Sequence, residues 1–393
     1  MTTPVRAAAG AADAILFPLC TFILSLYTLE HSTSLFITST ARLAQRLHVS
    51  ETLISLLTAG AEWEELFVVI AALVQHRPRL ALGNVLGSCV ANILGAFSLG
   101  LLVQAQAQQN QNQNQNGITS FDASARLYAT VLFTVTTAVV VLWGVGWLWT
   151  KVSGALLVLA FAIYVVGVGW SIYRGILDAP EDSDSYGNSD SGSESSSSPD
   201  SMPEGVGGGG GGGGGRADAN ARNDIDESES TALLNRRRQR QHYRCIIWDL
   251  GRLLVGFVAL SMSGYLLSHS SRLLAARFNI SETVFGATLL SFATTLPEKF
   301  VAVVSGARGH HGIMVANTVG SNIFLLTLCL GVTILGSASL AESASYAHEI
   351  FWVWASSASL TLAILVGSHR LVGVAMLIAY VTFLVLEFVL NRA

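Results

Sequence analysis

Ten stretches of predominantly apolar sequence, each long enough to cross a lipid bilayer, constrain this chain more than any other feature. A membrane-spanning helix needs about 20 such residues. Only 12% of the residues are charged, about half of the share in soluble globular proteins, so the chain cannot cover a surface that faces water. We therefore predict an all-α membrane protein with about ten transmembrane helices. The expected spans lie near residues 14–39, 51–75, 80–103, 125–148, 151–176, 246–272, 281–305, 311–336, 348–367 and 369–390.

Charge and cysteine content exclude several classes of function. A chain this apolar is not a soluble enzyme, and its net charge of −4 argues against a nucleic-acid binder that works through a basic face. The four cysteines are scattered, without CxxC or other ligand-like spacing, so we expect neither a disulfide framework nor a zinc site. We predict no enzymatic activity and no resident cofactor, with the lipid bilayer as a partner.

Residues 178–244 differ in kind from the sequence around them and separate the first five spans from the last five. Half of the chain's 26 acidic residues fall here, together with nine consecutive glycines and, near the end, four clustered arginines. Because this composition cannot bury a core, we predict a disordered linker, and the arginines favour its placement in the cytosol. The chain then divides into a first half (1–177), the linker (178–244) and a second half (245–393).

The two halves contain the same sequence pattern twice. Residues 43–53, LAQRLHVSETL, recur at 274–284 as LAARFNISETV, and GNVLGSC at 83–89 recurs at 316–322 as ANTVGSN. Glu65 lies as far before Asn84 as Glu298 lies before Asn317. Equivalent points are separated by five spans, an odd number, so one copy must be inverted relative to the other. We predict two inverted-topology five-helix repeats, an arrangement found in alternating-access transporters, whose site lies where the repeats meet.

In the second copy, polar residues gather around a proline inside an apolar stretch. Pro297 lacks an N–H and disrupts a helix, so we expect a break there that frees the carbonyl of Ala293 and collects Thr294, Thr295 and Glu298. An ionised glutamate in mid-membrane costs about 2.5–3.5 kcal/mol on insertion scales, so such a residue usually marks a site. The alternative is a glutamate that is protonated or paired with a lysine.

The first copy carries three acids but no proline. Glu62 and Glu65 are three residues apart and share a helix face, whereas Glu64 points elsewhere, toward the interface or a basic partner. If this copy breaks, it breaks at Gly60.

Each copy also carries a pair of polar residues spaced four apart. They are Asn84 and Ser88 in one copy and Asn317 and Ser321 in the other. Small residues beside them, at spacings such as Gly83-xxx-Gly87, are typical of close helix packing. We expect both roles together, with the small residues bringing the helices close and the polar side chains reaching the site.

Carboxylate, carbonyl, amide and hydroxyl groups form a site built only of oxygen. Hard cations such as Ca²⁺ take six to eight oxygen ligands, and nothing soft is offered that would favour zinc or copper. Because ionised glutamates are costly inside a bilayer, a carrier should change sides only when a divalent ion, sodium ions or protons neutralise them. That condition predicts exchange of transported cations rather than leak.

The pattern SET, then TxLPE, then ANxxGSN over residues 281–322 resembles the repeats of the calcium/cation antiporter superfamily, which includes the sodium/calcium exchangers. The resemblance covers both repeats and agrees with ten spans and a central loop. It implies that Glu65 and Glu298 coordinate the cation. It also implies assisting roles for Thr294, Thr295, Ser88, Asn92 and Ser321.

This chain departs from the family pattern mainly in its first repeat. That repeat is two residues short before Glu65, lacks the proline, carries Cys89 in place of an asparagine and has Glu62 where a serine or threonine is expected. In the second repeat, Leu325 replaces a site Asp or Asn. Our hypothesis is that Glu62 partly replaces the lost carboxylate.

Three functional interpretations remain open. The leading one is an antiporter that exchanges Ca²⁺ for Na⁺ or H⁺ by alternating access. The others are an antiporter of another cation and a non-transporting membrane scaffold that uses the long loop. Residues Glu229–Leu234 fit an acidic dileucine signal that a sorting adaptor could read, which favours an intracellular, vacuole-like membrane.

Overall fold

The computed structural model describes residues 3–46, 62–110, 121–173, 217–337, 346–367 and 370–390, and within these residues all regular structure is helical. In the labels below, η marks a π-helical segment. The elements are α1 (Thr3–Arg46), α3 (Trp63–Val74), α4 (Pro78–Val90), η1 (Ala91–Phe97), α5 (Ser98–Asn110), α6 (Ala123–Gly144), α7 (Lys151–Tyr173), α8 (Ala217–Phe278), α9 (Glu282–Phe285), η3 (Gly286–Leu290), α10 (Ser291–Thr294), α11 (Leu296–Arg308), α12 (His311–Phe324), η4 (Leu325–Cys329), α13 (Leu330–Gly336), α14 (Ala347–Val366) and α15 (Arg370–Leu390).

Most of the predicted spans are present as long apolar helices. Within the described ranges, eight helices are long and apolar enough to cross a membrane, and a bent pair adds a ninth. The predicted span at 51–75 is described only from Glu62 onward, as α3, and its earlier part lies outside the described residues. The all-α membrane fold is therefore confirmed.

The predicted break in the second repeat is confirmed. The segment Glu282–Thr294 meets Leu296–Arg308 at an angle of 48°, and Thr295 is the residue between them. Pro297 occupies the first turn of α11, a position where its missing N–H costs nothing. The backbone N–H of Thr295 donates to the Ser291 carbonyl at 3.1 Å, so the role of the Ala293 carbonyl as an oxygen ligand stays a prediction.

The two repeats share a deviation from regular helix. Asn92 lies inside the π-helical segment η1, and its counterpart Leu325 begins the π-helical segment η4. Such segments widen a helix by one residue and are frequent at functional sites. Their equivalent positions support the inverted-repeat arrangement.

Close contact between α4 and the segment 281–290 joins the two repeats. A Cβ atom added to Gly83 would lie 2.3 Å from the backbone oxygen of Thr283, and one added to Gly87 would lie 2.3 Å from that of Ala287. From the opposite side, a Cβ on Gly286 would meet the oxygen of Leu80 at 2.6 Å. Only glycine allows backbones to approach so closely, so the predicted packing role of these small residues is confirmed.

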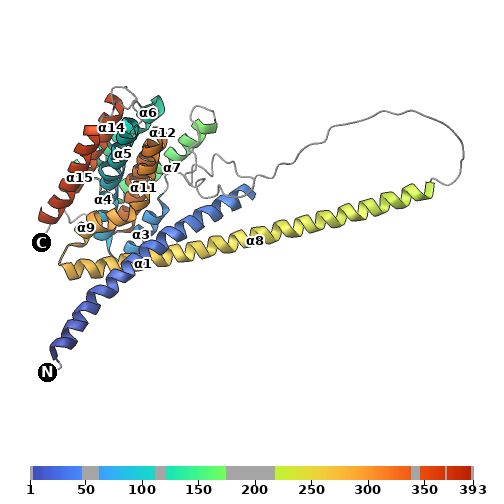
Figure 1. Cartoon of the computed structure of the whole chain (residues 1–393), viewed down its shortest axis with the longest axis horizontal. Helices are drawn as coiled ribbons and strands as arrows, with labels where there is room; N and C mark the ends of the chain where they lie inside the picture. Colours follow the sequence, from blue (N-terminus) through green and yellow to red (C-terminus); the bar gives the residue numbers. More distant parts are fainter. Residues whose placement is uncertain are drawn as a thin grey trace. The chain divides into compact units, whose positions relative to one another are not determined.

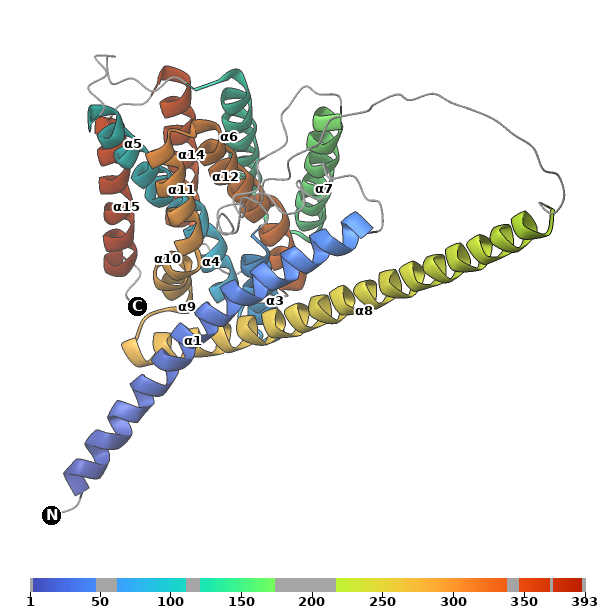
Figure 2. The same ribbon diagram turned by 45° about the vertical axis from the view of Figure 1, so that its right-hand side comes forward.

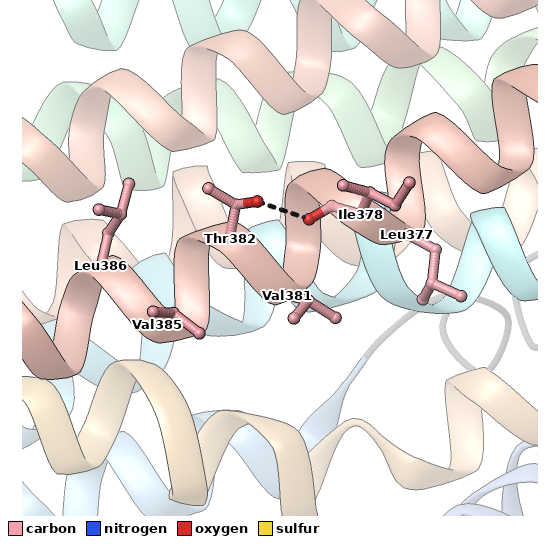
Figure 3. Close-up of a pocket in the computed structure, with 6 residues that line it drawn as sticks. All are labelled: Leu377, Ile378, Val381, Thr382, Val385 and Leu386. Carbon is pink, nitrogen blue, oxygen red and sulfur yellow. Dashed lines mark hydrogen bonds between the residues drawn. The ribbon is translucent and has the colours of Figure 1, made fainter.

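The remaining spans pack in pairs that each combine the two halves. Helix α5 packs against α11, α6 against α14, and α7 against α13. Figures 1 and 2 show α5, α6, α11 and α14 grouped together. Gly100 and Gly306 bring the first of these pairs into backbone contact. On α15, a largely apolar groove is lined by Leu377, Ile378, Val381, Thr382, Val385 and Leu386 (Figure 3). The two oxygen atoms drawn there bond to each other, because the Thr382 hydroxyl donates to the Ile378 carbonyl, so this groove offers no acidic ion site.

The described residues form two units, residues 1–182 with 252–393 and residues 183–251. The predicted disordered linker is only partly described, because residues 178–216 lie outside the described ranges. From Ala217 the chain is helical and continues as α8 into the sixth span, which differs from the disorder that we predicted for 217–244. Alanine, leucine, glutamine and arginine are strong helix formers, and a helix already formed by the following span propagates at little cost.

Candidate cation-binding site

Each repeat places a buried glutamate in the first turn of a helix that follows the candidate break. Glu65 is the third residue of α3, and Glu298 is the third residue of α11. The exposed fractions of these side chains are 1% and 9%, so neither is turned toward the acyl chains. A helix N-terminus carries partial positive charge and stabilises a nearby carboxylate. The equivalence that the repeat predicts is therefore present in three dimensions.

The Glu65 carboxyl is held by the neighbouring helix of its own repeat. Asn84 of α4 donates its amide N–H to Oε2 of Glu65, and the hydroxyl of Ser88, one turn later, donates to Oε1 at 2.9 Å. The Thr294 side chain of the second repeat lies near this carboxyl, with its hydroxyl proton donated to the Leu290 carbonyl. The spacing of four residues between Asn84 and Ser88 is what allows both to reach one carboxyl.

Glu62 lies directly before α3 and forms a second acidic position, 4% exposed. Its Oε1 accepts a hydrogen bond of 2.8 Å from the amide of Asn92 in η1. The Ser321 side chain of the second repeat lies near this carboxyl, with its hydroxyl proton donated to the Asn317 carbonyl. Asn92, a candidate through the family resemblance alone, therefore contacts an acid of the site.

The three carboxyls interact electrostatically with one another across the repeat boundary. Glu62 interacts with both Glu65 and Glu298, and Glu298 also interacts with Glu65. Among the described residues, no group of three His, Cys, Asp or Glu side chains is placed to hold a single metal ion. In this conformation an ion would therefore take at most two carboxyls, with neutral oxygens completing its coordination.

Several oxygens of the cluster are buried without a hydrogen-bond donor. Within the part of the chain that the structure describes, they are Oε2 of Glu62, Oε2 of Glu298, Oδ1 of Asn84 and Oδ1 of Asn92. An unsatisfied buried polar atom costs about 1–3 kcal/mol, and a native protein keeps one only where something else satisfies it. Oxygen atoms that lack donors are the groups that a hard cation binds, so these residues fit a cation.

The polar side chains of the second repeat mostly bond to their own helices. Ser321 donates to the carbonyl of Asn317 at 2.8 Å, Thr294 to that of Leu290, and Thr295 to that of Ser291. Asn317 is half-buried and makes no hydrogen bond with the three carboxyls in the described structure. Hydrogen bonds therefore join Asn84 and Ser88 to Glu65 and Asn92 to Glu62. Glu298, Thr294 and Ser321 lie near these carboxyls, whereas Thr295 and Asn317 make no hydrogen bond to a carboxyl in the described structure.

Two charged residues have surroundings that sequence reasoning left open. Glu64 lies beside Thr33 and Glu30 of α1 rather than beside a basic partner, and its charge also acts on Glu298 and Glu62. Lys299 is buried, 7% exposed, and its charge interacts with Glu298, Glu62 and Glu65. The position of Lys299 directly after Glu298 was the signal in the sequence. It was discounted because consecutive helical residues point about 100° apart, but a long lysine side chain can bend back toward the site.

Comparison with known proteins identifies one family of membrane proteins. The family model described as sodium/calcium exchanger protein matches residues 17–170 and 248–389. An uncharacterized membrane protein of Methanocaldococcus jannaschii is 22% identical over 304 residues, 77% of this chain and 76% of the relative. A sodium/calcium exchanger of Methanosarcina acetivorans is 30% identical over 145 residues, 36% of this chain and 41% of that protein.

Solved structures show the same fold. A structure of the sodium–calcium exchanger NCX_Mj, soaked with Na⁺ and Sr²⁺, aligns with a TM-score of 0.51 at 19% sequence identity and covers 94% of this chain and 98% of that one. Another structure of that exchanger, soaked with Na⁺ and no Ca²⁺, aligns with a TM-score of 0.50 over the same shares. The ten-span, two-repeat architecture predicted from the sequence is thus the fold of a known transporter.

Proposed function

The chain belongs to the sodium/calcium exchanger family, and from this premise we propose that it exchanges Ca²⁺ for Na⁺ or H⁺ by alternating access. It is an integral multi-pass membrane protein and a transporter rather than an enzyme. The carrying observation is the pair of buried glutamates, Glu65 and Glu298, each in the first turn of a helix and each from a different repeat.

The mechanism follows from the cost of buried charge. Two or three ionised carboxyls inside a bilayer are unstable without compensating cations. We propose that Ca²⁺ binds between Glu65 and Glu298, where the orphan oxygen of Asn84 completes part of its coordination. The protein then closes on one side and opens on the other only with the charge neutralised. Return of the carrier requires Na⁺ or H⁺ in place of Ca²⁺, which couples the two fluxes.

The neighbouring residues have distinct proposed roles. Ser88 and Asn84 hold Glu65 in one orientation through its two oxygens. Glu62, held by Asn92, adds negative field without being a ligand of the same ion as the other two carboxyls. The Thr294 hydroxyl lies beside Glu65 and links the broken span of the second repeat to the first.

The test is calcium flux in proteoliposomes that contain the purified full chain. Vesicles free of internal Ca²⁺ are loaded with Na⁺, with an acidic buffer, or with neither, and uptake of external ⁴⁵Ca²⁺ is measured under the resulting outward Na⁺ gradient, outward H⁺ gradient, or no gradient. We expect one of the two gradients to drive accumulation and its removal to stop it. Flux that needs no counter-ion would identify a channel, and a complete absence of ion movement would favour the scaffold that the long loop suggests.

The membrane in which the protein works is a second part of the proposal. Residues Glu229–Leu234 form an acidic dileucine string, and we propose that an adaptor reads it and directs the protein to a vacuole-like membrane. Replacement of Leu233 and Leu234 by alanine should move a fluorescently tagged chain to the cell surface. An unchanged distribution would reject this signal but leave the transport proposal untouched.

A further inference from the structure

Lys299 places an ammonium group among oxygens at the break of the seventh span. Its Nζ donates to the backbone carbonyl of Thr295 at 3.2 Å, to that of Phe292 at 3.4 Å, and to the hydroxyl of Thr295. It also lies 4.8 Å from the centre of the Phe292 ring, a cation–π distance. The Phe292 carbonyl belongs to the last turn before the break, where a helix leaves its backbone oxygens without their usual donors, and the Thr295 carbonyl, at the break itself, also accepts the backbone N–H of Lys299 at 3.3 Å.

The hydrogen-bond pattern requires the charged form of the lysine. The Thr295 hydroxyl donates its own proton to the carbonyl of Ser291 at 2.6 Å, so toward Lys299 it acts as an acceptor. The other two partners are carbonyls, which only accept. Three acceptors around one nitrogen take three N–H donors, which an ammonium has and a neutral amine lacks.

The lysine is packed into the interior rather than extended toward solvent. Its Cε would lie 3.5 Å from a Cβ added to Gly95, in the π-helical segment η1 of the first repeat. Its charge interacts with Glu298, Glu62 and Glu65. The surroundings of Nζ are two carbonyls, a hydroxyl, an aromatic face and nearby carboxylates, which is how a protein binds a monovalent cation.

We propose that the Lys299 ammonium is a tethered monovalent cation, which permanently fills an oxygen-lined cation position beside the acidic centre, so that Ca²⁺ is carried without a monovalent co-ion. This inference rests on the proposed exchange of Ca²⁺. The lysine supplies one positive charge that would otherwise have to come from solution before the site can close. Without it, the negative charges of Glu62, Glu65 and Glu298 exceed the charge of one Ca²⁺ ion by one, and the nearby Glu64 adds to that excess.

The test creates the vacancy and offers small cations to fill it. Lys299→Ala removes the ammonium and leaves space, whereas Lys299→Arg keeps the charge and serves as the matched control. The melting temperature of each purified full-length variant is measured in detergent at saturating Ca²⁺. The salt is choline chloride, which is too large for the vacancy, or an equal concentration of potassium or methylammonium chloride.

We expect potassium or methylammonium to raise the melting temperature of Lys299→Ala by several degrees relative to choline, because a ligand that binds only the folded state stabilises it. The wild type and Lys299→Arg should show no such difference. In proteoliposomes, calcium flux through Lys299→Ala should fall about tenfold or more in choline, since an unpaired buried charge is costly. Potassium or methylammonium on the Ca²⁺ side should restore it.

Three results would overturn the inference. One is a Lys299→Ala protein that carries Ca²⁺ as the wild type does and responds to no added cation. Another is failure of both Lys299→Ala and Lys299→Met to fold even in methylammonium while Lys299→Arg folds, which would make the amine a structural partner only. The last is a wild-type protein that Ca²⁺ does not stabilise and that carries no Ca²⁺ across the membrane. That result rejects the proposed function and, with it, this inference.

Discussion

The two repeats begin their half-helices with the same glutamate but surround it differently. In the first repeat, Glu65 accepts hydrogen bonds from Asn84 and Ser88, and a second acid, Glu62, is held by Asn92. In the second repeat, Glu298 keeps one oxygen without a donor, and the next residue is a buried lysine. One side of the site is therefore acidic and hydrogen-bonded, whereas the other combines a carboxylate with its own cation.

This difference shows how an inverted duplication can diverge without losing its site. The backbone positions are preserved, since both glutamates are third residues of their helices and both repeats carry a π-helical segment at the equivalent place. The charges differ: the first repeat carries Glu62 where the second has Thr295, and the second carries Lys299 where the first has Leu66. The extra acid and the extra base have opposite charges.

The largest effect is expected from neutralising the glutamate that the two repeats share. Glu65→Gln and Glu298→Gln should each reduce calcium flux more than a hundredfold, because removal of one partner from a buried charge pair costs about 3–5 kcal/mol. The measurement is ⁴⁵Ca²⁺ uptake in proteoliposomes. Glu349→Gln is the matched control, since Glu349 is an equally buried glutamate on α14 outside the site. A flux retained by either site variant would mean that the two repeats do not share one ion.

The second prediction compares the loss of calcium affinity at two equivalent serines, Ser88 in the first repeat and Ser321 in the second. Ser88 donates to a carboxylate, whereas the Ser321 proton goes to the carbonyl of Asn317. A hydrogen bond to a charged group contributes about 1.5–3 kcal/mol, so Ser88→Ala should weaken calcium binding about ten- to a hundredfold. Ser321→Ala should weaken it about threefold or less. Isothermal titration measures both, and Ser356→Ala, a buried serine bonded within α14, controls for loss of a hydroxyl. Equal losses at Ser88 and Ser321 would contradict the asymmetry.

A smaller effect is expected from Glu62, the acid without a counterpart. Because it influences the ion through space rather than as a shared ligand, Glu62→Gln should lower calcium affinity about three- to tenfold. Asn92→Ala should add little in the Glu62→Gln background, since the two residues act through one hydrogen bond. Undiminished calcium affinity in Glu62→Gln would remove the hypothesis that this residue replaces the lost carboxylate.

The smallest effect on ion binding is expected from the packing that joins the repeats. Gly87→Ala introduces a Cβ 2.3 Å from the oxygen of Ala287, which should lower the free energy of unfolding by about 1–3 kcal/mol. Thermal unfolding in detergent measures the change. Gly312→Ala is the control, because nothing lies within 4 Å of the added Cβ there. Equal stability of the two variants would show that α4 and the segment 281–290 can separate freely.

The features that follow from local rules were predictable from the sequence. Apolar length gives the spans, Pro297 gives the break, and the spacing of Asn84 and Ser88 gives their common reach toward Glu65. The helix over residues 217–244 was not predicted. Composition shows that this segment cannot bury a core, but it does not show that a helix can extend into the segment from the neighbouring span.

The direction of individual side chains was not predictable in the same way. Thr295 was expected at the ion, but its hydroxyl bonds to Ser291 and receives the Lys299 ammonium. That choice depends on which oxygens the break brings near, a tertiary property with no signature in residue spacing. The orphan oxygen of Glu298 likewise depends on how the two repeats meet.

The most direct measurement is a structure of the purified chain with Ca²⁺, or with Sr²⁺ as a heavier substitute located by anomalous scattering. Our account predicts one ion between the repeats, with a carboxyl oxygen of Glu65 and one of Glu298 both about 2.3–2.6 Å away and the Lys299 ammonium still on its own oxygens. An ion bound by one repeat alone, or bound elsewhere while both glutamates keep their present partners, would contradict it.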